Sequence, residues 1–273
     1  MTRPSRSHTA AFTAVEILVS LALAGLVIAS VVGVLVTQRR FYTLYFARIE
    51  AWDAVAAGAE ILASELRGLS PAAGDLYALA GDSVALRSVV GFAYVCGLED
   101  GGAAWLLRGV VGSLETRPRD SVLVFHEGEP ARADDDRWLV VHLDRVEPVT
   151  TTACPGGRAA ERRAHLSDPV PGLRPGAPLH AFRPYVYRVY RDRSGRPWLG
   201  RRLRGDPIQP VVGPMEPPPR GLSLRALEPD GRPAGAPGSA TWVRFALRAR
   251  VPLGRHAVAE SAAAAAFLRN GHP

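Results

Sequence analysis

Lysine is absent from this sequence of 273 residues, so all 33 basic side chains are arginine, against 26 acidic ones. We interpret this exclusive use of arginine as codon bias, because the arginines are scattered among strand-like segments and proline-rich loops. No DNA- or RNA-binding motif accompanies the net charge of +7, so nucleic acid is not an expected partner. An arginine-rich surface still favours anionic partners such as lipid headgroups.

Catalytic and metal-binding motifs are missing too. The seven histidines form no HxH, HExxH or Cys/His cluster, and no phosphate-binding glycine loop or GxSxG motif occurs. His126 and His142 end predicted strands, and we interpret them as ordinary core or surface side chains. Asp134-Asp135-Asp136 lacks the alternating oxygen ligands and the glycine of a calcium loop, which favours a solvated turn. The sequence therefore predicts no enzyme activity, no cofactor, no metal site and no small-molecule substrate.

Cysteine is scarce, since only Cys96 and Cys154 occur. Two cysteines at this separation do not make a zinc site. In an exported domain a single pair favours one disulfide, which would contribute roughly 4 kcal/mol in the chain-entropy model. Two unrelated buried thiols are the alternative, and the sequence leaves both open.

The most informative segment present is 11–36, AFTAVEILVSLALAGLVIASVVGVLV. Ile17 to Val36 contains no charged residue, histidine or proline. As a helix rising about 1.5 Å per residue it is roughly 30 Å long, the thickness of the hydrocarbon core of a bilayer. Glu16 lies at the start of this run, where a carboxylate is costly and so indicates a function. The alternatives are a conventional secretory signal and a single-pass anchor with an incidental glutamate.

The segment before the run, Met1–Ala11, is short and polar, carries arginine but no acid, and ends in small residues. Together with Phe12-Thr13-Ala14-Val15-Glu16, it resembles the class III leader of type IV pilins and type II secretion pseudopilins. The resemblance implies that a prepilin peptidase cuts between Ala11 and Phe12, and that the new N-terminus at Phe12 is N-methylated. Ala11 departs from the glycine that is usual in the family.

The same resemblance implies a role for Glu16. Cleavage would leave a positive amine on Phe12 at membrane depth, and Glu16 would neutralise this amine in its own or a neighbouring subunit. A charge left unpaired in a low dielectric is expensive, so the pair would set the axial register of a filament. The resemblance also implies a single pass through the inner membrane, with the N-terminus in the cytoplasm and the head in the periplasm or at a filament tip.

Beyond Val36 an apolar stripe continues, with members three or four residues apart, as on one face of a helix. Gly68 and Pro71 predict the end of this helix. The stripe consists of Phe41, Tyr45, Ile49, Trp52, Val55, Ala59, Leu62 and Leu66. We therefore predict one helix from Phe12 to about Arg67, with a transmembrane half at 12–36 and an amphipathic half at 37–70. Gly25 and Gly33 are interpreted as positions for close packing in a membrane helix.

From Asp75 onward the pattern alternates with a period of two, which is typical of strands. Strands are predicted at 83–90, 92–96, 103–108, 121–126, 137–143, 185–191, 197–203, 222–227 and 241–251. Residues 155–180 and 205–221 are dense in Pro, Gly and Arg and are predicted as exposed loops, and the alanine-rich 257–268 as a short helix. The predicted fold class is α+β, with a long N-terminal transmembrane and amphipathic helix packed on a β-rich globular head at 75–273; pilin-like describes it by resemblance.

Chain length narrows what the resemblance implies, because PilW-like minor pilins and J-class pseudopilins have large heads. It implies a structural subunit that primes or caps a type IV pilus or a type II secretion pseudopilus. The implied partners are a prepilin peptidase, other minor subunits, the major subunit and the inner-membrane assembly platform. The alternative is a single-pass, membrane-anchored extracytoplasmic binding protein with no filament role. A membrane-tethered hydrolase with dispersed catalytic residues is a third, weaker alternative.

Overall fold

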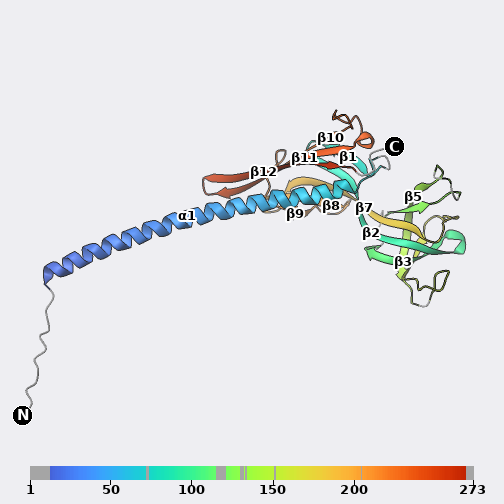
Figure 1. Cartoon of the computed structure of the whole chain (residues 1–273), viewed down its shortest axis with the longest axis horizontal. Coiled ribbons are helices and arrows are strands. Elements are labelled where there is room, and N and C mark those ends of the chain that lie inside the picture. Colours follow the sequence, from blue (N-terminus) through green and yellow to red (C-terminus); the bar gives the residue numbers. More distant parts are fainter. Residues whose placement is uncertain are drawn as a thin grey trace, which may run out of the picture.

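A computed structural model describes residues 13–71, 74–114, 121–129, 132, 134–150, 152–203 and 205–268. One long helix, α1 (Ala14–Arg67), precedes a large β-rich domain, so the chain is α+β (Figure 1). The strands are β1 (Leu76–Ala80), β2 (Ser83–Glu99), β3 (Ala104–Gly112), β4 (Ser121–His126), β5 (Arg137–Pro148), β6 (Arg162–Leu166), β7 (Ala177–Arg191), β8 (Pro197–Leu203), β9 (Gln209–Val212), β10 (Leu222–Leu227), β11 (Trp242–Leu253) and β12 (His256–Phe267).

Helix α1 has 54 residues and runs through both predicted halves without a break. Every residue from Ala14 to Phe46 is exposed, and Ala47 is the first buried one. Figure 1 shows the consequence: the N-terminal half of α1 projects from the β domain, and only its C-terminal half is packed.

Two long strands, β2 and β7, pair along their length and connect two parts of a nine-stranded sheet. At one end they belong to the ring β2-β3-β6-β5-β4-β7, which is closed by the direct pairing of β7 with β2. Trp105 and Leu107 are fully buried in the apolar core of this ring. At the other end β1, β8 and β9 flank the two strands.

The C-terminal half of α1 packs between this second end of the sheet and a separate sheet of order β10-β11-β12. Leu62 and Leu66 of α1, Tyr187 of β7 and Phe245 of β11 are almost fully buried in their shared core. Each element has one apolar face, and the sandwich covers all of them.

The face of α1 that packs on the domain matches the predicted stripe only in part. Phe41, Tyr45 and Trp52 are 64%, 52% and 61% exposed. The buried face carries the small residues Ala47, Ala51, Ala54 and Gly58 together with three members of the predicted stripe, Val55, Leu62 and Leu66. Small side chains let the helix backbone approach the sheet closely, which the spacing of large apolar residues does not reveal.

Several strand predictions need correction. The segments 83–90 and 92–96 form one strand, β2, whose register with β7 shifts between Val89 and Gly91. A Cβ at Gly91 would lie 2.3 Å from the carbonyl oxygen of Ser113, so the chain passes too close here for a side chain. The glycine accommodates a neighbouring backbone within the strand and does not end it.

The predicted loops and tail are partly wrong. Residues 155–180 include β6 and the start of β7, and Leu173 between them is buried; residues 205–221 include β9 and the fully buried Met215. Residues 257–267 of the tail belong to β12, which pairs antiparallel with β11 along its whole length. Alanine has a high helix propensity, but pairing with an amphipathic strand overrides so weak a preference.

Candidate functional site

The candidate functional site is the projecting half of α1, because most of the exposed large apolar side chains in the described chain lie on it. The helix is long and apolar enough to cross a membrane, and none of its most apolar window is buried in the molecule. Its apolar side chains lie all around the helix, as shown by Val15 and Leu18, each 67% exposed, and Val19, 53% exposed. A helix that is apolar on all sides needs a surrounding apolar phase such as lipid or other helices.

Glu16 lies in the first turn of this half and folds back on the helix start. Its Oε2 accepts hydrogen bonds from the backbone N–H of Thr13 at 2.9 Å and from the Thr13 hydroxyl at 3.0 Å. The Thr13 side chain in turn accepts from the Glu16 N–H at 3.3 Å. This is a reciprocal capping box, which satisfies two backbone donors that a helix start otherwise leaves open.

The capping box therefore places the Glu16 carboxylate against the residue that follows Phe12. The predicted cleavage and methylation positions, Ala11 and Phe12, lie outside the described residues. Thr13 is a site residue that the sequence reasoning missed, although Thr-x-x-Glu before an apolar run is its sequence signature.

Where the projecting half meets the domain, aromatic rings gather on α1. Phe41 and Tyr45 stack with ring centroids 6.2 Å apart, and Tyr42 stacks on Phe46 at 6.4 Å. Arg39 and Arg40 lie immediately before these rings, and both are exposed. The hairpin β11–β12 runs beside α1, and its turn points toward the projecting half (Figure 1). Together they enclose a groove of about 680 Å³ between Arg39, Tyr42 and Phe46 on α1 and residues 251–253 of β11.

Polar contacts fix the packed half of α1 to the domain. Arg48 pairs with Glu260 of β12 at 2.9 Å, and the Tyr187 hydroxyl donates to Glu65 at 2.9 Å. Burial, reinforced by the charge of Glu65, raises the pKa of Tyr187, so this hydroxyl keeps its proton. These contacts join both ends of the packed half to the β domain.

A buried ion pair holds the segment that connects the C-terminal end of α1 to β1. Asp75 accepts from the Ser70 N–H at 2.9 Å and pairs with Arg87 of β2 at 3.2 Å. Burial raises the pKa of Asp75, while the Ser70 hydrogen bond and the Arg87 charge act in the opposite direction. The guanidinium of Arg87 also lies over the Phe182 ring, 4.6 Å from its centroid.

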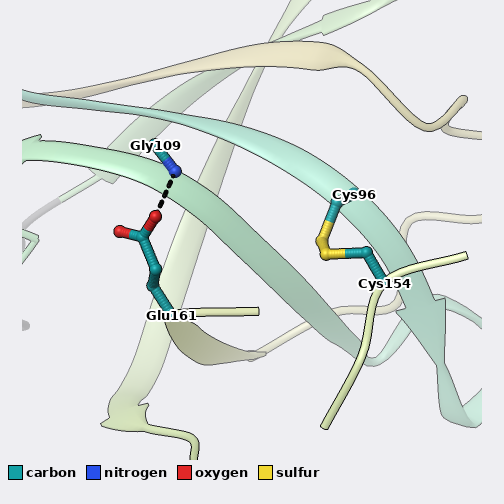
Figure 2. The surroundings of a disulfide bond; sticks show 4 residues. All are labelled: Cys96, Gly109, Cys154 and Glu161. Carbon is teal, nitrogen blue, oxygen red and sulfur yellow. Dashed lines mark hydrogen bonds between the residues drawn. A yellow bond between two sulfur atoms is a disulfide. The ribbon is translucent and has the colours of Figure 1, made fainter. Parts of the chain in front are cut away.

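Cys96 and Cys154 form a disulfide in the structure, with their Cα atoms 5.4 Å apart, so the first of the two sequence-based alternatives is the one seen (Figure 2). It ties the loop after β5 to β2. Nearby, Glu161 accepts from the backbone N–H groups of Gly109 at 2.8 Å and Val110 at 3.1 Å. These bonds lower the pKa of Glu161 and hold the same segment against β3.

The remaining candidates are structural in this fold. His126 pairs with Arg137 and His142 with Ser121, at opposite ends of the β4–β5 ladder, so the two histidines do not meet. Asp135 and Asp136 accept from the backbone N–H groups of Glu129 and Gly128 and so cap the loop between these strands. In the part of the chain that the structure describes, no three His, Cys, Asp or Glu side chains gather in a way suited to a metal ion.

Comparison with known proteins returns no match to this chain, whether with protein-family models, with curated proteins or with solved structures.

Proposed function

We propose that this chain is a minor pilin or pseudopilin: a structural subunit that a prepilin peptidase cleaves before Phe12 and that then primes or caps a filament. The position of Glu16 carries the proposal. Its carboxylate turns back toward Thr13, the second residue after the proposed cut, at the start of an apolar span that nothing else in the described chain covers.

The projecting half supports this role because it needs an apolar partner in every direction. Lipid supplies that partner in the membrane, and the same surface packs on neighbouring helices once the subunit leaves the bilayer. Gly25 and Gly33 fit such packing, since a Cβ built on either would meet nothing within 4 Å in the isolated chain. The head, held on the packed half of α1, then presents the β domain to the outside of the filament.

The mature N-terminus is the first test. The full chain is expressed with a prepilin peptidase and recovered from membranes, and mass spectrometry is expected to find an N-methylated Phe12 at its start. An Ala11→Leu variant, with a bulky residue before the cut, is expected to keep its leader. An intact leader in the unaltered chain contradicts the proposal and leaves a membrane-anchored binding protein as the remaining interpretation.

The role of Glu16 is tested separately, because a capping box alone also explains its hydrogen bonds. Glu16→Gln keeps a side-chain acceptor for the Thr13 N–H but removes the charge, whereas Glu16→Ala removes both. If the charge neutralises an amine, both variants insert in the membrane and fail to co-purify with sister subunits. Assembly retained by Glu16→Gln assigns Glu16 to capping alone. Glu60→Gln, at an exposed position in the packed half, is the matched control.

A further inference from the structure

A second site lies at the foot of the projecting half, where α1 meets the turn of β11–β12. We propose that this groove binds the headgroup and the upper acyl chain of an anionic phospholipid in the leaflet next to the β domain. The inference rests on the membrane insertion of α1 that the proposed function also requires, but filament assembly plays no part in it.

The depth of the groove favours a lipid. If Ile17 to Val36 spans the hydrocarbon core, Arg39 and Arg40 lie about 5–6 Å beyond its edge at the rise of an α-helix. The headgroup layer occupies roughly 5–8 Å on each side of the core, so both guanidinium groups lie within it. Tyr42 and the other exposed rings follow at once, which matches the preference of aromatic side chains for the membrane interface.

The hairpin supplies the second wall. Its last β11 residues line the groove opposite Arg39 and Tyr42, so the turn that follows lies at the same level of α1. That turn carries Arg255, and His256 follows it as the first residue of β12; both are exposed. The result is a largely apolar groove that Arg39 lines, with Arg40 next to it in the sequence and Arg255 two residues beyond Leu253.

Charge complementarity selects an anionic headgroup. Arg39, Arg40 and Arg255 are exposed cations. The acids on the facing elements are Glu50, which lines the groove on the side away from the membrane, and Glu260, which is paired with Arg48. The membrane end is therefore positive, and each arginine near an anionic surface favours binding by about fivefold.

The test measures lipid preference in the intact chain. The full-length protein is reconstituted in phosphatidylcholine vesicles with a small fraction of either spin-labelled phosphatidylglycerol or spin-labelled phosphatidylcholine. Electron paramagnetic resonance then gives the share of each labelled lipid that the protein immobilises. We expect a several-fold preference for phosphatidylglycerol that weakens as salt is added.

Three variants locate the effect. Arg39→Gln, Arg40→Gln and Arg255→Gln combined are expected to bring the preference close to one, and Arg255→Gln alone to lower it by a few-fold. The matched control combines Arg137→Gln, Arg158→Gln and Arg162→Gln, which are exposed arginines of the β5–β6 region, far from the projecting half, and is expected to change nothing.

Equal immobilisation of both lipids by the unaltered chain overturns the proposal, as does an undiminished preference in the triple variant or in Arg255→Gln. Extraction at alkaline pH separates this outcome from failure of the proposed function. A chain that stays in the bilayer without lipid preference contradicts the lipid site alone, whereas a chain released from the vesicles contradicts the membrane anchor.

Discussion

Gly58 of α1 and Leu247 of β11 lie so close that a Cβ built on Gly58 would come within 2.9 Å of Leu247 Cδ1. On its other side the same Cβ would lie 3.2 Å from Val212 Cγ1 of β9. The helix backbone thus rests on side chains from both sheets at once. This contact sets the rotation of α1 about its axis and leaves Tyr45 and Trp52 outside.

The Gly58 contact predicts a strong dependence on side-chain size. Gly58→Ala meets only the ends of flexible side chains and gains about 1 kcal/mol of helix propensity, so we expect stability to change by less than about 1 kcal/mol. Gly58→Leu must push the two sheets apart and is expected to cost about 1–3 kcal/mol. Denaturant unfolding of the full chain in detergent micelles measures both, and equal stability of the two variants would contradict the close packing described here.

The same contact explains why the extent of α1 was predictable, whereas its packed face was predicted correctly only at Val55, Leu62 and Leu66. The apolar run, the helical spacing and Gly68 fix where the helix lies, because these are local signals. The choice between a face of large side chains and a face of alanines depends on how closely the partner sheet approaches, and that distance is not encoded in α1. The exposed rings of Phe41 and Tyr45 lie outside this contact, where the proposed membrane and filament would supply their apolar surroundings.

The β domain shows the same division. Strands with clear alternation, such as 121–126, 197–203 and 222–227, have the predicted bounds. β6 and β12 were missed because the arginines of β6 and the alanines of β12 conceal the alternation of apolar and polar residues. Both segments become strands by pairing with a neighbouring strand. At the candidate site Glu16 was singled out from its cost in an apolar run, while the Thr13 capping partner has a local signature that was overlooked.

The disulfide predicts a large effect on stability. Cys96 and Cys154 are 58 residues apart in the sequence, and β3, β4 and β5 lie between them. The chain-entropy model gives roughly 4 kcal/mol for a loop of this length. The double variant Cys96→Ser, Cys154→Ser is expected to lose about this much free energy of unfolding, measured in denaturant, and reduction of the unaltered chain should have a similar effect. A loss well under 1 kcal/mol would contradict the structural role of this bond.

The ion pair between Asp75 and Arg87 also predicts a large effect on stability. Asp75→Ala removes the acceptor for the Ser70 N–H and leaves the largely buried Arg87 guanidinium without this carboxylate. Breaking one side of a buried pair costs about 3–5 kcal/mol. Asp82→Ala, at the exposed turn between β1 and β2, is the matched control and is expected to be near neutral. Equal melting temperatures of the two variants would show that packing alone holds the segment between α1 and β1.

The turn between β7 and β8 predicts how stability responds to acid. Asp192 accepts from the Ser194 hydroxyl at 2.6 Å and from the backbone N–H groups of Ser194 at 2.8 Å and Arg196 at 2.9 Å, while Trp198 Nε1 donates to its other oxygen at 3.0 Å. The Ser194 hydroxyl and the other donors lower the pKa of Asp192 from the ordinary 3.8 to about 2. Because the folded pKa lies below the unfolded one, the charged carboxylate stabilises the fold above the unfolded value.

That stabilisation is lost as the pH falls from 3.8 through about 2, the folded pKa of Asp192. Asp192→Asn keeps an acceptor in the turn but does not titrate, so the other carboxylates affect both proteins alike. We therefore expect the unaltered chain to melt at a higher temperature than Asp192→Asn at neutral pH, and the difference to shrink across this acid range. A melting-temperature difference that stays constant with pH would mean that the hydrogen bonds to Asp192 do not depend on its charge.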